Sequence, residues 1–139
     1  MSLFSERLKL LRKQSKLSQR QLGLTINSSE ATIQSYELSL RTPSIEIAIA
    51  LAEYFDVPTD YLLGAGLYKH AEQIEEHYDY IKNFISNIII DEKPNLIEDY
   101  IQNLDACENI VDRIALLSIF IKKISFDNNE IRIHLKLYK

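Results

Sequence analysis

The chain is poor in the residues that metal and redox sites require. It has one cysteine, Cys107, and three histidines in 139 residues. A lone cysteine cannot form an internal disulfide, and His70 and His77 are too far apart for the four-residue spacing of helical metal ligands. We therefore expect no metal site, and we interpret Cys107 as a buried helix residue.

Glycine is scarce as well, with three residues in the whole chain. Gly23, Gly64 and Gly66 do not form a glycine-rich phosphate loop. The acidic run between Glu72 and Asp79 is typical of a solvated helix face rather than of a paired-carboxylate site. The sequence therefore indicates no catalytic residues and no cofactor, and we do not expect an enzyme.

Long apolar runs are also missing, since no stretch approaches the roughly 20 residues of a membrane span. The first six residues do not show the basic region and apolar stretch of an export signal. We expect a cytoplasmic protein with no membrane partner. A hydrophobic content of 46% with 26% charged residues is ordinary for a globular protein, and the length leaves room for two small domains, which we place at residues 1–66 and 67–139.

Two short helices are predicted within residues 17–37. Ser18 and Ser29 each stand before an apolar pattern of helical period, so each can cap the helix that follows. Asn27 lies at the turn between them, where asparagine tolerates a left-handed backbone. The spacing is that of two helices packed at a steep angle, with polar side chains of the second pointing outward. Such a pair is typical of proteins that read DNA.

Five successive segments extend this pattern without a gap. They are Leu8 with Leu11-Arg12, Leu17-Ser18-Gln19 with Leu22, Ile33 with Tyr36-Glu37, Arg41-Thr42-Pro43-Ser44, and Phe55 to Gly64. Together they resemble the Cro and lambda-repressor-like (XRE) helix-turn-helix family, over about residues 3–65. The resemblance implies a five-helix DNA-binding domain of a transcriptional regulator. The other half of the chain resembles no family that we recognise.

The resemblance also implies roles for individual residues. Arg12 and Glu37 would form an internal ion pair, and Gln19 would bond a phosphate or brace a neighbour that contacts a base. Glu30 could accept from a cytosine amino group, while Ala31 or Thr32 could touch a thymine methyl. The full set expected at the DNA is Gln19, Arg20, Ser29, Glu30, Ala31, Thr32, Gln34, Ser35 and Arg41.

The net charge of −4 is unevenly distributed along the chain. Residues 1–20 hold six basic side chains against one acid, whereas residues 21–66 hold only Arg41 against six acids. The positive charge of the first half is therefore on its first two helices and at Arg41, where phosphate would lie in this docking geometry.

Several residues depart from the family pattern. Gly23 stands where alanine is usual, and Ser39 stands where glycine is usual, so the turn at Ser39 is expected to be reshaped or mildly strained. Four apolar residues occupy positions that the family generally leaves polar, which indicates a covered surface. They are Leu10, Leu38, Leu40 and Ile47.

The second half begins with apolar residues spaced alternately by four and three from Leu67 to about Ile90, which predicts one helix with a heptad seam. We expect Pro94 to end this helix and two further helices to follow. The second of these is predicted to be apolar around much of its circumference and to extend as far as Ile124. The end of the chain alternates like a strand, expected to form a hairpin with residues 124–126. A lone hairpin is marginal in water, so it must pack on the helices or pair with another subunit's strand.

We expect residues 67–139 to hold a homodimer, because the seam and the strand carry more apolar surface than a unit of this size can bury alone. The interface expected from this reasoning comprises Ile74, Tyr78, Ile81, Ile85, Ile88, Ile131, Ile133 and Leu135. The predicted fold class is mainly α, with a five-helix DNA-binding domain followed by a helical dimerisation domain that ends in a short β-hairpin.

The favoured interpretation is a dimeric repressor of phage or mobile-element type that binds double-stranded DNA at a two-fold symmetric operator. One alternative is an antitoxin-like or anti-repressor protein whose residues 67–139 bind a protein partner, and co-purification of a foreign protein would favour it. A second is a regulator whose helical half encloses a small-molecule or peptide effector, which an unbroken apolar core would disfavour.

Overall fold

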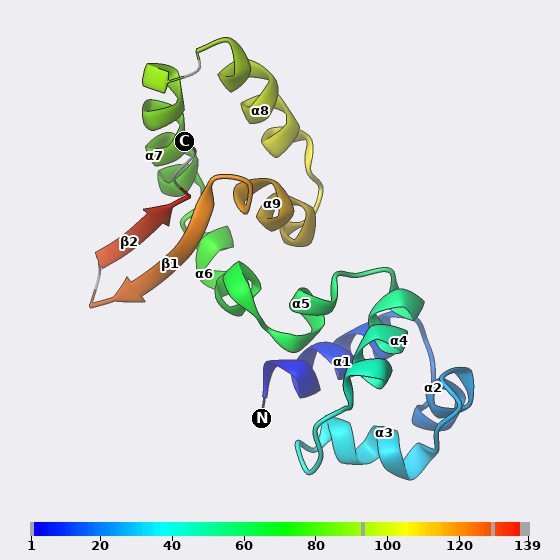
Figure 1. Cartoon of the computed structure of the whole chain (residues 1–139). Coiled ribbons are helices and arrows are strands. Elements are labelled where there is room, and N and C mark those ends of the chain that lie inside the picture. The colour runs from blue at the N-terminus through cyan, green and yellow to red at the C-terminus, as the bar shows by residue number, and fades with distance from the viewer. Residues whose placement is uncertain (1, 93, 129, 137–139) are drawn as a thin grey trace. The chain divides into compact units, whose positions relative to one another are not determined.

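A computed structural model describes residues 2–92, 94–128 and 130–136, with side chains except those of residues 89–97. The chain divides into two compact units, Met1–Ala65 and Gly66–Lys139. The described residues are mainly helical and end in one antiparallel hairpin, which confirms the predicted fold class (Figure 1). None of the helices in these ranges has the length and apolar content needed to span a membrane.

The first unit is built from five helices: α1 (Leu3–Gln14), α2 (Gln19–Thr25), α3 (Glu30–Glu37), α4 (Ile45–Phe55) and α5 (Thr59–Leu63). Each of the first four begins at a serine whose hydroxyl accepts from the amide three residues on. The caps predicted at Ser18 and Ser29 are confirmed, and each such cap contributes about 1 kcal/mol. Asn27 has the predicted left-handed backbone, with φ of 56°.

One apolar core holds these five helices together. Its centre consists of fully buried side chains from every helix: Leu8, Leu22, Ile33, Leu51 and Leu62. Of the four residues expected on a covered surface, Leu10, Leu38 and Leu40 are exposed. Ile47 is not, because it packs against the core. The expectation for Ile47 was therefore wrong.

The second unit starts with a 3₁₀ helix, η1 (Gly66–His70), followed by α6 (Ala71–Glu76) and α7 (Tyr78–Glu92). The single helix predicted here is wrong in two respects, because its first turn is a 3₁₀ helix and because the chain breaks at His77. The rings of His70 and His77 both pack against Phe126, at centroid distances of 5.5 and 5.9 Å. This packing against a distant strand overrides the continuous helical pattern.

Helices α8 (Pro94–Ala106) and α9 (Ile110–Leu117) follow, and the break predicted at Pro94 is confirmed. The last helix is shorter than predicted, because Ile121 and Ile124 lie on strand β1 (Ile121–Asp127). This strand pairs antiparallel with β2 (Glu130–Leu135), which confirms the hairpin. In Figure 1 the two strands form a hairpin, and β1 also packs on η1.

The heptad seam faces the interior of its own unit. Ile74, Tyr78, Ile81 and Ile85 are buried, and Ile88 is half-buried. These side chains cannot also cover a second subunit, so assigning the first four to a dimer interface was wrong. Helix α8 packs on α7 and helix α9 packs on α6, which the heptad pattern alone does not reveal.

Tyr78 joins three helices of this unit through polar contacts. Its hydroxyl donates to Asp105 Oδ1 at 3.0 Å, and the Arg113 guanidinium lies 4.3 Å from its ring centroid. Burial and the hydrogen bond to Asp105 raise the pKa of Tyr78 to about 12. Tyr78 is therefore a structural anchor that stays neutral at physiological pH.

Cys107 lies just past the end of α8 and is half-buried, so its placement as a buried helix residue was wrong. Its Sγ donates to Asn103 O at 3.2 Å. Burial and the nearby charge of Asp112 raise the pKa of the Cys107 thiol, which disfavours the reactive thiolate.

Gly23 sets the distance between α2 and α3. A Cβ atom placed there would lie 2.8 Å from Ser29 C and 2.9 Å from Ser29 O, and these are backbone atoms that cannot rotate away. The two helices therefore approach more closely than a side chain permits.

We expect Gly23→Ala to destabilise the protein by about 1–3 kcal/mol, because the overpacking outweighs the gain of about 1 kcal/mol in helix propensity. Urea unfolding measures the effect. Leu24→Ala, at an exposed position of the same helix, is the matched control and should stay within about 0.5 kcal/mol of the wild type. A more stable Gly23→Ala would show that the helices separate at little cost.

Candidate nucleic-acid interface

Helix α3 packs on α1 and α2 through its apolar side and leaves its polar side outward. Ile33 and Tyr36 are buried, whereas Glu30, Ala31 and Gln34 are exposed. Thr32 and Ser35 are half-buried on the same outer side. The arrangement presents a short row of polar side chains on a rigid helix.

Glu37, at the end of α3, joins three helices. Arg12 Nε from α1 donates to Glu37 Oε1 at 2.5 Å, and Arg12 Nη2 donates to Oε2 at 3.1 Å. Gln19 Nε2 from α2 donates to the same Oε2 at 2.8 Å. The remaining Arg12 nitrogen, Nη1, donates to Leu17 O. This bidentate pair with a third donor fixes the orientation of α3.

The environment of Glu37 keeps its carboxylate charged. Burial alone would raise its pKa, but the hydrogen bonds from Arg12 and Gln19 and the charges of Arg12 and Lys9 outweigh burial. The pKa of Glu37 is therefore lowered. Gln19, expected at the DNA, directs its amide nitrogen inward to Glu37, because the start of α2 lies beside the end of α3.

A second attachment, which the sequence did not reveal, holds the end of α3 to the start of α1. The buried Ser5 hydroxyl donates to Tyr36 O at 2.5 Å and lies 2.7 Å from Ser39 Oγ. Ser39 has a left-handed φ of 60°, a conformation that costs a residue with a side chain more than it costs glycine. The turn that we predicted to be reshaped therefore has a serine, Ser39, whose hydroxyl contacts Ser5, where the family usually has a glycine.

Three hydroxyl groups on the outer side of α3 are engaged locally. Ser29 Oγ accepts from Thr32 N at 3.2 Å and lies 2.9 Å from Thr32 Oγ1, while Ser35 Oγ donates to Ala31 O at 2.9 Å. Ser35 Oγ uses its proton in this bond and keeps its acceptor lone pairs.

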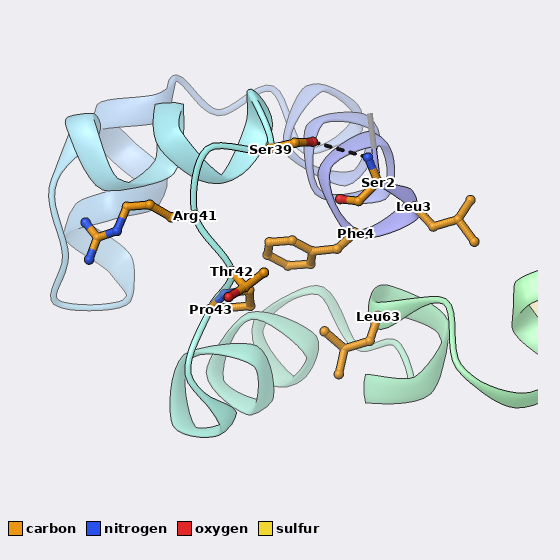
Figure 2. Close-up of a pocket in the computed structure, with 8 residues that line it drawn as sticks. All are labelled: Ser2, Leu3, Phe4, Ser39, Arg41, Thr42, Pro43 and Leu63. Atoms are coloured by element: carbon orange, nitrogen blue, oxygen red, sulfur yellow. Dashed lines mark hydrogen bonds between the residues drawn. The ribbon is translucent and has the colours of Figure 1, made fainter.

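Arg41 lies in the loop between α3 and α4, and it is exposed. The loop borders a pocket of about 340 Å³ lined by Ser2, Leu3, Phe4, Ser39, Arg41, Thr42, Pro43 and Leu63. Figure 2 shows the Arg41 guanidinium pointing away from the other lining side chains. Arg41 is therefore placed to meet an anion outside the pocket.

The basic side chains of residues 1–20 fall into two groups. Arg7 and Arg12 point inward: Arg7 Nη1 donates to Tyr61 O at 2.5 Å, and Arg12 pairs with Glu37. The others are exposed, namely Lys9, Lys13, Lys16 and Arg20. The cluster available to phosphate is therefore smaller than the sequence count indicated.

We expect Arg12→Ala to lower the free energy of unfolding by about 3–5 kcal/mol, because it strands a buried carboxylate. Lys13→Ala, exposed on the same helix, is the matched control and should change little. Chemical denaturation at pH 7 measures both.

Charged Glu37 stabilises the folded state at pH values above the ordinary carboxylate pKa. This stabilisation is lost as the pH falls through the lowered pKa that Glu37 has in the folded protein. The stability difference between wild type and Arg12→Ala should therefore shrink below about pH 4. Unchanged stability with abolished DNA binding would instead place Arg12 at the nucleic acid.

Comparisons with known proteins bear on the first unit. The helix-turn-helix family model matches residues 8–62. Two uncharacterized HTH-type transcriptional regulators of Bacillus subtilis (strain 168) are similar: YobD, 34% identical over 62 residues, and YqaE, 38% identical over 61 residues. These matches cover 45% and 44% of this chain and 55% and 53% of the relatives, so the chain spans about half the length of the curated relatives that it matches.

A solved structure is also similar, the P22 c2 repressor protein in complex with synthetic operator 9T in the presence of Tl⁺. It is 33% identical, with a TM-score of 0.43, and the match covers 45% of this chain and 96% of that chain. The family match spans the capped helix pair and the Arg12–Glu37 contact described above. Residues 8–62 accordingly belong to the helix-turn-helix family, in a unit of the Cro and lambda-repressor-like (XRE) type.

Proposed function

We propose that this chain is a DNA-binding transcriptional regulator, acting as a dimeric repressor of the phage or mobile-element type on a two-fold symmetric operator. The observation that carries the proposal is the outer side of α3. Its exposed polar side chains stand on a helix whose end is held by the bidentate Arg12–Glu37 pair and by Ser5. A rigid polar helix face of this kind fits the major groove.

The proposed contacts with DNA are of two kinds, to base edges and to phosphate groups. Glu30, Ala31, Thr32, Gln34 and Ser35 would read base edges, with Glu30 accepting from a cytosine amino group and Thr32 touching a thymine methyl. The exposed residues Arg20 and Arg41 would bind phosphate, and the exposed lysines of α1 would add to the positive electrostatic potential that attracts the DNA.

One observation favours a runner-up, a protein that binds another protein rather than DNA. Leu38 and Leu40 follow α3 and are 53% and 72% exposed. Exposed leucines beside the expected DNA edge would suit a contact with another protein, in addition to the partner site that the antitoxin-like or anti-repressor alternative places in residues 67–139. Binding measurements on the intact chain separate the two functions.

Neutralising Arg41 should weaken binding to all duplexes alike and reduce the salt dependence by about one unit of log–log slope, because one fewer counterion is released. Thr32→Ala should instead change which sequences are preferred, by about 1–3 kcal/mol for the lost base contact, with the slope unchanged. Anisotropy titrations at several salt concentrations, on a site selected from random duplexes, measure both patterns.

Lys69→Gln, at an exposed position of the second unit, is the control for Arg41→Gln and should alter neither affinity nor slope. A wild-type chain that binds no duplex better than random DNA at moderate salt would contradict the regulator and favour the protein-binding alternative.

The full chain should sediment as a dimer at tens of micromolar, whereas residues 1–65, which have their own core, should be monomeric. Losing the tether should weaken operator binding by about 10²–10⁴, the usual scale of bivalent linkage. Analytical ultracentrifugation and anisotropy on the two forms measure this. A monomeric full chain would contradict the proposed dimer but would leave the proposed DNA binding by the first unit unaffected.

A further inference from the structure

Strand β2 has one free edge. It pairs with β1 on one side, and no other described strand lies on its other side. Native proteins usually blunt such edges with proline, a bulge, a covering element or charged side chains, and here the charges are those of Glu130, Arg132 and Lys136. Strand β2 contains no proline, and the irregularity in the ladder, between Ile121 and Lys123, lies on β1 instead. The backbone of this edge is therefore able to pair with a strand that matches these charges.

The backbone groups at this edge can be identified. Lys136 N donates to Phe120 O at 2.8 Å, so the amide of Lys136 points toward the β1 side. Backbone groups alternate along a strand, hence those of His134, Arg132 and Glu130 also point toward β1. The N–H and C=O groups of Ile131, Ile133 and Leu135 consequently point to the free edge.

We propose that the free edge of β2 binds the same edge of a second copy of this chain, antiparallel about a two-fold axis at Ile133, to form a four-stranded sheet across the dimer. This rests on the dimer of the proposed function and names the surface that makes it. Three residue pairs then exchange two hydrogen bonds each: Ile131 with Leu135, Ile133 with itself, and Leu135 with Ile131.

The side chains favour this register. It joins the half-buried apolar sides of the two hairpins, because Ile131, Ile133 and Leu135 of both copies fall on one face. It also places Glu130 of one copy opposite Lys136 of the other, twice per dimer. Opposite charges across a strand pair are stabilising, and like charges are not.

Neighbouring registers lack this complementarity. An axis at Arg132 places that arginine opposite itself, and an axis at His134 places Arg132 opposite Lys136. An axis between residues would place apolar side chains opposite polar ones.

The single chain holds the two charged residues only weakly. Glu130 Oε2 lies 3.2 Å from Arg132 Nη2, with side chains 67% and 64% exposed, and Lys136 Nζ donates to Ser118 O. Such exposed contacts contribute little, so exchanging them for the pair between copies costs little. A two-stranded hairpin is marginal by itself, and a four-stranded sheet with an apolar face is more stable.

Charge exchange tests the register. Glu130→Lys or Lys136→Glu alone should each raise the dimer dissociation constant about tenfold, because two attractive pairs per dimer become repulsive. The double variant, Glu130→Lys with Lys136→Glu, should restore the wild-type value. Sedimentation equilibrium of the full chain measures the constants, and thermal unfolding followed by circular dichroism verifies that each variant is folded.

Disulfide formation on mixing gives a second test that leaves the backbone of β2 intact. In this register Arg132 faces His134 of the other copy in a non-hydrogen-bonded pair, with Cα atoms about 4.5 Å apart. Each residue lies beyond disulfide reach of its own counterpart, at more than about 7 Å. In a Cys107→Ser background, Arg132→Cys and His134→Cys should cross-link rapidly when mixed, and neither should cross-link alone.

The outcomes are distinct. Restoration by the double variant together with cross-linking only on mixing supports the proposal. A wild-type dimer that ignores the charge exchanges, or cross-links equally in every combination, overturns the proposal and leaves the proposed dimeric regulator standing through another surface. A wild-type monomer overturns both this edge and the dimer, while operator binding by the same sample would still support the DNA-binding unit.

Discussion

The orientation of α3 depends on one buried carboxylate. Glu37 accepts hydrogen bonds from Arg12 on α1 and Gln19 on α2, so one side chain links the three helices that form the candidate interface. Its burial makes the contact consequential, because an unpaired charge there would be costly. Ser5 holds the same end of α3 through Tyr36 O and Ser39. The outer side of α3 can therefore stay polar without losing its position.

This arrangement limits what the first unit can do alone. Arg7 and Arg12 support the fold, and the cations left for phosphate are the exposed ones on α1 and α2 and Arg41. Phosphate contacts supply a large share of a protein's affinity for DNA, so under the proposed function a single copy with few such contacts would bind weakly. Under the proposed function, a dimer would compensate by placing two DNA-binding units on one operator, and the second half of the chain would hold the dimer together. Its free strand edge offers backbone groups and paired charges that suit a second copy.

Local features of the sequence determined much of the fold. The serine caps at Ser18 and Ser29, the left-handed turn at Asn27, the break at Pro94 and the terminal hairpin each depend on a few neighbouring residues, and each was predicted correctly. The resemblance to a helix-turn-helix family was likewise readable from five short segments, and the family match bears it out. The Arg12–Glu37 contact came from that resemblance rather than from spacing.

Only the tertiary structure decided which partner each face meets. The heptad pattern correctly grouped Ile74, Tyr78, Ile81 and Ile85 on one side, but these residues pack within their own unit rather than across a dimer. Packing against Phe126 also broke the helix at His77, and pairing with β2 drew Ile121 and Ile124 into a strand. A sequence period shows which side chains share a face, because backbone geometry sets it. What covers that face depends on residues far away in the chain, which no local pattern encodes.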